Sequence, residues 1–490
     1  MRSAVHPAFL SVSLLLLSPF SLLPFPVHAA PVHAAAARES GAPRTMRAEY
    51  VHSGSAEAER FGLRRVVVEP LPWPGNPARP VDDTNLGKYL FEIVDAASDR
   101  VVYSRGFASI YGEWETTAEA TRLERAFDES VRFPTPAGEF DLRISKRDER
   151  NRFAPVWSVR IDPAAPDVDR AEPASPGPLL ELHRGGDPAH RVDLLILGDG
   201  YTAAERARFE EDARRMTAIL LQTSPFRERQ ADFNIWALCP EARESGVSRP
   251  SDGIWRASPL GAQYDAFGSE RYVLTFADRA FREAASFAPY DFVEILVNGE
   301  TYGGGGIFGL YGTVAARSVW APYVFVHEFG HHFAGLADEY YTSEVAYLPA
   351  EERLEPWEPN VTALLDPSRL KWRDLVSDGA PLPTPWNKEA FDAHSRGIQQ
   401  RRRAIRAEDR PEQDMDELFR RQQREQTRML SAERYAGVVG VFEGAMYETR
   451  GYYRPEVDCV MFTRNEVPFC AVCRRALARV IDLHTGSAPN

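Results

Sequence analysis

The pattern of apolar and polar positions divides the chain into segments of different character. Between residues 45 and 161, short β-branched or aromatic runs such as 63–69, 89–95 and 140–145 are separated by turn residues. This spacing predicts the strands of an N-terminal antiparallel β-sandwich. Residues 162–178 are rich in proline, which blocks both helix and central strand, so we expect this linker to mark a domain boundary.

From residue 179 to residue 490 the pattern alternates between buried strands and helices. Mainly apolar runs at 192–197, 233–238 and 290–297 predict strands of one sheet, and a capping box, Thr202-Ala-Ala-Glu205, opens a helix. This order predicts an α/β catalytic domain. Within it, the charged stretch 386–435 predicts one or two solvated helices as an insertion, with a substrate-contacting arm as the alternative.

The first residues of the chain have the features of an export signal. Arg2 precedes an apolar run that continues to Leu23, is broken by Pro19, and is followed by small residues at 27–30. The run is short and proline-broken for a membrane span of about 20 residues. We therefore predict a signal peptide over 1–34, a secreted or periplasmic protein, and no stable membrane insertion after cleavage.

Charge and cysteine content narrow the class of protein further. The formal net charge of −13 over 490 residues argues against a nucleic-acid partner, which would require a basic face. The four cysteines are Cys239, Cys459, Cys470 and Cys473. In an exported protein they permit one or two disulfides, and we favour one from Cys459 to Cys470 or Cys473 over a redox pair or half of a zinc site.

The segment 327–340, HEFGHHFAGLADEY, carries the strongest chemical signal. Residues four apart lie on the same face of a helix, so His327 and His331 can direct imidazole nitrogens at one metal ion. Glu328 follows the first histidine directly and can accept a proton from a water at that metal. The pattern predicts a Zn²⁺ site with Glu328 as the general base.

A catalytic zinc ion needs a third protein ligand. Gly335 is placed to end the helix in a left-handed turn, after which the chain can double back. Asp338, just beyond this turn, is the preferred ligand. His332 lies about 100° around the helix from His331 and is not expected to ligate. The alternatives to Asp338 are Glu339, Glu355 and Glu358.

Several further motifs occur in a fixed order along the chain. They are YSRGFASIYGEW at 103–114, FDESVRFP at 127–134, ILGDGYT at 196–202, YGGGG at 302–306, EPWEPNVT at 355–362 and DCVM at 458–461. Together with the metal segment, they resemble the IgA-peptidase family of zinc metallopeptidases, which belongs with the metzincin-like group. The resemblance implies a metzincin-like zinc-peptidase fold for the catalytic domain and makes Met461 the methionine turn beneath the histidines.

The register of this sequence departs from the usual metzincin pattern. Metzincins usually place the helix-ending glycine three residues after the second histidine, and the third ligand three residues later. Here Gly335 comes four residues after His331, so the register is one residue longer. By that spacing Asp338 is again the third ligand.

Two other features bear on substrate binding. The glycines at 302–306 could let a substrate backbone pair closely with an edge strand, or could simply make a flexible loop. Tyr447, Tyr452 and Tyr453 precede Met461 and are candidates for oxyanion stabilisation, with core packing as the alternative.

The sequence therefore predicts an exported zinc-dependent endopeptidase. It would hydrolyse protein or peptide substrates by metal-activated water, with Glu328 as general base. One alternative is a zinc amidase acting on cell-wall peptides. Another is a non-catalytic adhesion or binding protein that uses the N-terminal sandwich.

Overall fold

The computed structural model describes residues 43–343, 345–348 and 352–486. The predicted signal peptide over 1–34 lies outside these ranges. All described residues belong to one compact unit. Among the helices in these ranges, none is long and apolar enough to span a membrane.

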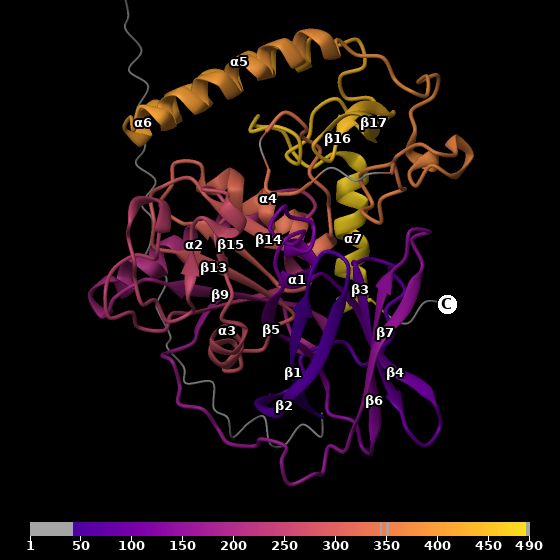
Figure 1. The fold of residues 1–490 in the computed structure, drawn as a ribbon, viewed down its shortest axis with the longest axis vertical. Coiled ribbons are helices and arrows are strands. Elements are labelled where there is room, and N and C mark those ends of the chain that lie inside the picture. Colours follow the sequence, from indigo (N-terminus) through magenta and orange to yellow (C-terminus); the bar gives the residue numbers. More distant parts are fainter. Residues whose placement is uncertain (1–42, 344, 349–351, 487–490) are drawn as a thin grey trace, which may run out of the picture. The chain divides into compact units, whose positions relative to one another are not determined.

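Residues 43–161, called the front region below and coloured indigo and purple in Figure 1, consist mainly of two antiparallel sheets. Their strand orders are β2-β1-β5 and β4-β3-β6-β7. Apolar side chains of both sheets, including Met46, Phe91 and Phe133, pack into a single core. The antiparallel strands predicted for this region are confirmed. The elements are β1 (Arg44–Gly54), β2 (Glu59–Pro72), β3 (Tyr89–Asp95), β4 (Arg100–Phe107), α1 (Ile110–Trp114), β5 (Arg125–Pro134), β6 (Phe140–Arg147) and β7 (Phe153–Ile161).

The region after the linker is built on a six-stranded sheet in the order β14-β15-β13-β9-β10-β8. The four inner strands are parallel to one another, and the two edge strands are antiparallel to their neighbours. The mixed α/β region predicted here is confirmed. Its strands are β8 (Leu180–Arg184), β9 (Val192–Asp199), β10 (Phe233–Leu238), β11 (Ala262–Gln263), β12 (Leu274–Thr275), β13 (Phe292–Val297), β14 (Gly304–Ile307), β15 (Tyr311–Ala315), β16 (Phe442–Ala445) and β17 (Glu448–Arg454).

Most of the helices cover one face of this sheet, and the front region together with α3 (Asp278–Ala285) covers the other. Leu194 of β9 belongs to the same core as Phe329 in the helical layer, whereas its neighbour Leu195 packs with Trp114 of the front region. Burial on both faces explains why β9 is apolar without interruption from Leu194 to Leu197. The helices are α2 (Arg206–Gln222), α3 (Asp278–Ala285), α4 (Ala321–Ala334), α5 (Lys388–Ala407), α6 (Glu412–Ser431) and α7 (Ala471–Thr485).

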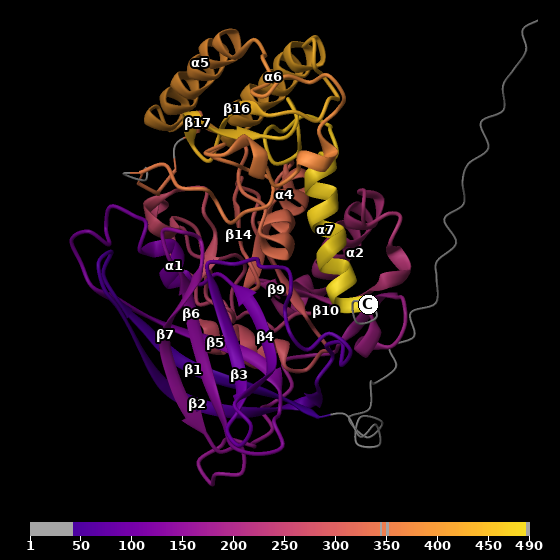
Figure 2. The ribbon, with the colours of Figure 1, turned by 90° about the vertical axis from the view of Figure 1, so that its right-hand side faces the viewer.

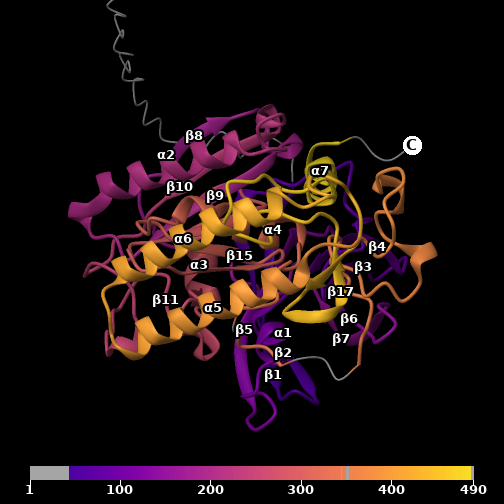
Figure 3. The same cartoon turned by 90° about the horizontal axis from the view of Figure 1, so that it is seen from above.

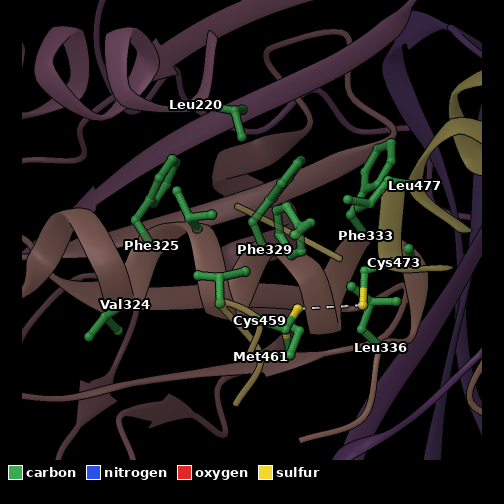
Figure 4. Close-up of a cluster of buried hydrophobic side chains, with 14 of the residues drawn as sticks. Leu220, Val324, Phe325, Phe329, Phe333, Leu336, Cys459, Met461, Cys473 and Leu477 are labelled. Atoms are coloured by element: carbon green, nitrogen blue, oxygen red, sulfur yellow. Dashed lines mark hydrogen bonds between the residues drawn. The ribbon is translucent and has the colours of Figure 1, made fainter. Parts of the chain in front are cut away.

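Helix α4 lies in the middle of the helical layer. Phe325, Phe329 and Phe333 project from one side of it toward Leu220 of α2, and Met461 lies against the other side (Figure 4). A helix with apolar contacts on more than one side is held inside the protein rather than on its surface. The packing therefore fixes the rotation of α4, and with it the direction of its histidines.

The charged stretch 386–435 contains α5 and α6, which lie side by side in two perpendicular views (Figures 2 and 3). Four of their apolar side chains are buried in the core that contains Phe329, called the main core below. They are Phe391, Ile398, Met415 and Phe419. The charged residues of both helices lie mostly on the exposed faces. The two helices are therefore anchored by an apolar stripe on each.

A buried histidine joins the strands of the front region. The rings of Phe61 and Tyr111 stack on the two faces of His52, with centroids 4.0 and 3.9 Å away. Its Nδ1 lies 3.0 Å from Glu129 and its Nε2 lies 3.0 Å from Glu59. Burial alone would lower the pKa of His52, but these two carboxylates outweigh it and raise the pKa.

All four cysteines lie within the described residues and are free thiols. The disulfide that the sequence favoured is absent: Cys459 Sγ and Cys473 Sγ lie 3.9 Å apart, compared with about 2.0 Å for a disulfide bond. Cys239 is in a separate part of the chain, where its sulfur packs near Gly198 at the end of β9.

Candidate metal centre

The end of α4 is shaped by a glycine. Gly335 adopts a left-handed conformation (φ 57°, ψ 37°), and its N–H donates to the carbonyl of His331. A Cβ at this position would come within 2.5 Å of the Trp357 ring. Only glycine meets both requirements, and the chain turns back here as the sequence predicts.

This turn brings three side chains together. The Nε2 atoms of His327 and His331 lie 3.2 Å apart. Asp338 Oδ1 lies 3.0 Å from the first and 3.3 Å from the second. His327 and Asp338 are buried, and His331 is partly exposed.

Two backbone carbonyls fix the direction of the histidine rings. The Nδ1 of His327 donates to the carbonyl of Val460 at 3.0 Å, and the Nδ1 of His331 donates to that of Leu336. Because a carbonyl oxygen only accepts, each Nδ1 carries the proton, and Nε2 of a neutral ring presents a lone pair.

With both rings neutral, the three converging atoms all bring lone pairs to one point, where a cation would satisfy them. Ligand atoms around tetrahedral zinc, at bonds of about 2.0–2.1 Å, stand about 3.3 Å apart. The observed separations of 3.0 to 3.3 Å fit that ion.

The closeness of Asp338 also affects the protonation of His331. Burial would lower the pKa of His331, but the charge of Asp338 outweighs it and raises the pKa to about 9.

Asp338 is held in place by contacts on both sides. Asn360, in the EPWEPNVT motif, accepts from the N–H of Ala337 at 2.8 Å and donates to its carbonyl at 3.0 Å. Tyr447 donates its hydroxyl to Asp338 Oδ2 at 2.5 Å. The N–H of Met446 donates to the Asp338 carbonyl at 3.0 Å. Residues distant in sequence thus position this carboxylate.

The alternative ligands point elsewhere. Among the described residues, Asp338 alone supplies a carboxylate to the group that contains His327 and His331. Glu339 instead faces a cluster of cysteine thiols. Glu355 forms an ion pair with Lys371 at 3.3 Å. Glu358 lines the cleft near the histidines but does not join their group.

His332 faces away from the centre, as its helical position predicts. Its Nδ1 lies 2.9 Å from Glu294 on β13, and both side chains are buried. Burial lowers the pKa of His332 to about 3 and raises that of Glu294. This pair fastens α4 to the sheet.

Glu328 lies between two depressions of the surface. One is a cleft that runs along β14, and the other is a pocket next to α5 and α6. Burial raises the pKa of the Glu328 carboxyl, and the neighbouring histidines oppose that shift. The pocket is partly lined by Phe391 of α5 and by Gln422 and Gln426 of α6. The charged insertion therefore contributes to the surroundings of this glutamate.

The glycine-rich motif is an edge strand rather than a flexible loop. Gly304 exchanges backbone hydrogen bonds with residues 271 and 273. A Cβ on Gly306 would come within 2.3 Å of the Glu328 carbonyl oxygen and 3.0 Å of His331 Cβ. The glycines let β14 approach α4 closely, so the strand forms a wall of the cleft.

The three predicted tyrosines take different places. Tyr447 contacts the centre through Asp338. Tyr452 lines the cleft and packs with Ala337 in a small core cluster. Tyr453 packs against the main core and pairs its backbone with Thr362.

Further residues at the centre were missed by the sequence reasoning. Tyr323 lies one turn before His327, with its hydroxyl 3.3 Å from His327 Nδ1. That position could have been found from the four-residue spacing. Tyr340 stacks on His327 at 6.2 Å between centroids and accepts a hydrogen bond from Arg271 at 3.0 Å. No local signal marks Arg271, because it comes from a distant segment.

Comparison with known families identifies the chain. A family model described as IgA Peptidase M64 matches residues 180–481. The chain belongs to this family. A second model, Peptidase M64 N-terminus, matches residues 38–158, so the resemblance drawn from the motifs is confirmed over both regions. Membership in a peptidase family identifies the chain as a hydrolase of protein or peptide substrates. No curated protein matches it.

Proposed function

We propose that this peptidase is an exported, zinc-dependent endopeptidase. In this proposal His327, His331 and Asp338 hold the zinc ion and Glu328 is the general base. The observation that carries it is the convergence of three lone-pair atoms at zinc-like separations, with the partly buried Glu328 adjacent. Export to the periplasm or the exterior rests on the signal-like pattern of residues 1–34.

We further propose a front β-sandwich and a metzincin-like catalytic domain with Met461 as its methionine turn. The contacts of Met461 support this assignment. A Cβ on Gly330 of α4 would lie 3.0 Å from its sulfur, and its carbonyl accepts from the N–H of Glu339 at 2.9 Å. The residue before it, Val460, holds the ring of His327. The segment thus forms the floor of the centre.

The chemistry is divided between the metal and the side chains. When bound, zinc would polarise the scissile carbonyl and acidify a water molecule. Glu328 accepts the proton of the attacking water and later returns it to the leaving amine. The Tyr447 hydroxyl would donate to the developing oxyanion by turning its single proton away from Asp338 Oδ2. No covalent intermediate with the protein is needed.

The substrate backbone would pair with the outer edge of β14. The position of this strand at the edge of the sheet, beside Glu328, supports that orientation. Arg271 and its neighbours cover the edge at Gly304, so pairing would occur from Gly305 onward. An extended peptide bound there would run past the two histidines through the cleft.

Hydrolysis assays with Glu328→Gln test this function. Wild-type protein should cleave casein, lose activity with a chelator and regain it with zinc. Glu328→Gln should lose nearly all activity, whereas Glu300→Gln, at an exposed glutamate, should retain it. Equal activity in both variants would contradict the mechanism. Cleavage of cell-wall peptides without cleavage of proteins would favour the amidase alternative.

A further inference from the structure

A second cluster of potential ligands lies beneath the candidate metal centre. Cys459, Cys470, Cys473 and Glu339 bring four ligand atoms within 4.8 Å of one another. Cys473 Sγ is 3.9 Å from Cys459 Sγ and 3.4 Å from Glu339 Oε1 (Figure 4 draws the two sulfurs). All four side chains are at most 2% exposed.

Only one oxygen of the Glu339 carboxylate in this cluster accepts a hydrogen bond. Asn360 donates to Glu339 Oε1 at 3.0 Å. Glu339 Oε2 is fully buried and has no hydrogen-bond partner among the described residues. A buried carboxylate oxygen without a donor is costly, and a cation at this point would remove that cost.

Backbone N–H groups are directed at two of the three sulfurs. Cys470 caps the N-terminus of α7, and its sulfur accepts from the N–H of Cys473 at 3.4 Å. The sulfur of Cys459 accepts from the N–H of Cys470 at 3.3 Å. Backbone donors and a helix N-terminus both stabilise thiolates, which are the form that binds metals.

We propose that Cys459, Cys470, Cys473 and Glu339 bind a second, structural zinc ion. Sulfur atoms around tetrahedral zinc, at bonds of about 2.3 Å, stand about 3.8 Å apart, close to the separation of the Cys459 and Cys473 sulfurs. Four protein ligands leave no open position, so the site is closed and non-catalytic. Each thiol releases its proton to solvent when the metal binds.

A disulfide would account for less of this cluster. It would join two of the three sulfurs, leave the third as a thiol, and bring no partner to Glu339 Oε2. A metal ion satisfies all four groups together. In an exported protein, coordination would also keep these thiols from oxidation.

The cluster is connected to the catalytic floor by the backbone. Glu339 directly follows Asp338, so one short segment would supply a ligand to each ion. Cys459 stands two residues before Met461, whose carbonyl accepts from the N–H of Glu339. The second ion would therefore position Asp338 and Met461 without touching the substrate. The two ligand sets share no residue, so this inference stands independently of the proposed function.

Metal analysis of the His327→Ala/His331→Ala double variant tests this inference. The wild type should contain about two zinc ions per chain, and the double variant about one. After replacement of zinc by cobalt(II), the double variant should show thiolate-to-cobalt charge-transfer absorption. If the catalytic proposal alone were wrong, the wild type would contain one ion and the double variant would retain it.

Cysteine variants in the double-variant background provide the matched comparison. Cys473→Ser should lose the remaining ion and the charge-transfer band, whereas Cys239→Ser should keep both. If Cys473→Ser does not fold, the measurement on the double variant still decides. A double variant that is folded but metal-free would overturn the inference. So would a protein mass two hydrogens lower with Cys459 in a disulfide, or a cobalt spectrum without the thiolate band.

Discussion

Replacement of Asn360 by alanine should weaken both the fold and the catalytic metal site. The side chain is fully buried and makes three hydrogen bonds, two with the backbone of Ala337 and one with Glu339. It thereby holds the segment that carries Asp338 against the end of α4. Asn360→Ala removes this restraint without touching a proposed ligand of the catalytic ion.

The magnitude follows from the groups left unpaired. The N–H and carbonyl of Ala337 would both lose their partner in a buried site, at about 1–3 kcal/mol each. The free energy of unfolding should therefore fall by about 2 to 6 kcal/mol. Loss of a residue that orients a ligand typically costs about 10- to 100-fold in metal affinity.

Urea denaturation measures the fall in the free energy of unfolding. The loss of metal affinity is measured by the zinc concentration that restores half of the hydrolytic activity after chelation. Asn298→Ala is the matched control, because Asn298 is also buried and donates to the carbonyl of Gly200 and to Glu205, away from the centre. It should be destabilised without a change in zinc requirement. The reasoning is refuted if both variants need equally more zinc, or if Asn360→Ala is as stable as the wild type.

Three further changes test other parts of the account. Gly306→Ala should reduce hydrolysis at least tenfold, because its Cβ would come within 2.3 Å of a carbonyl oxygen of α4; Gly138→Ala, with open space around it, should match the wild type in the same assay. Tyr447→Phe should lower kcat by about 10²-fold, as expected for an oxyanion donor, while elemental analysis shows the same zinc content as the wild type. An unchanged kcat would remove the tyrosine from the mechanism. His52→Gln should be less stable than the wild type below pH 6.5, and this difference should shrink as pH rises through the elevated pKa of His52. A stability difference that grows with pH in denaturation experiments would contradict that assignment.

Local patterns predicted the features that depend on neighbours in sequence. The four-residue spacing of His327 and His331 needs only a helix, and Gly335 needs only a helix end. The mainly apolar runs of β9 and β10 indicate burial on both faces, which the packing of the sheet provides. These predictions agree with the structure because short-range geometry determines them.

Features that depend on long-range packing were not predictable in the same way. The sequence favoured a disulfide at Cys459, since spacing alone does not distinguish a pair of thiols from a cluster that also contains Glu339. That cluster exists because the start of α7 docks beneath α4. Likewise, the 302–306 glycines were open to two interpretations. Only the contact of Gly306 with α4 shows why side chains are excluded there.

Crystallography of Glu328→Gln grown with zinc, with anomalous data collected at the zinc edge, tests the central claim most directly. The account predicts an anomalous peak about 2.0–2.2 Å from the Nε2 atoms of His327 and His331 and from a carboxylate oxygen of Asp338. Absence of a peak between these three side chains, in a crystal that contains zinc, would contradict the account.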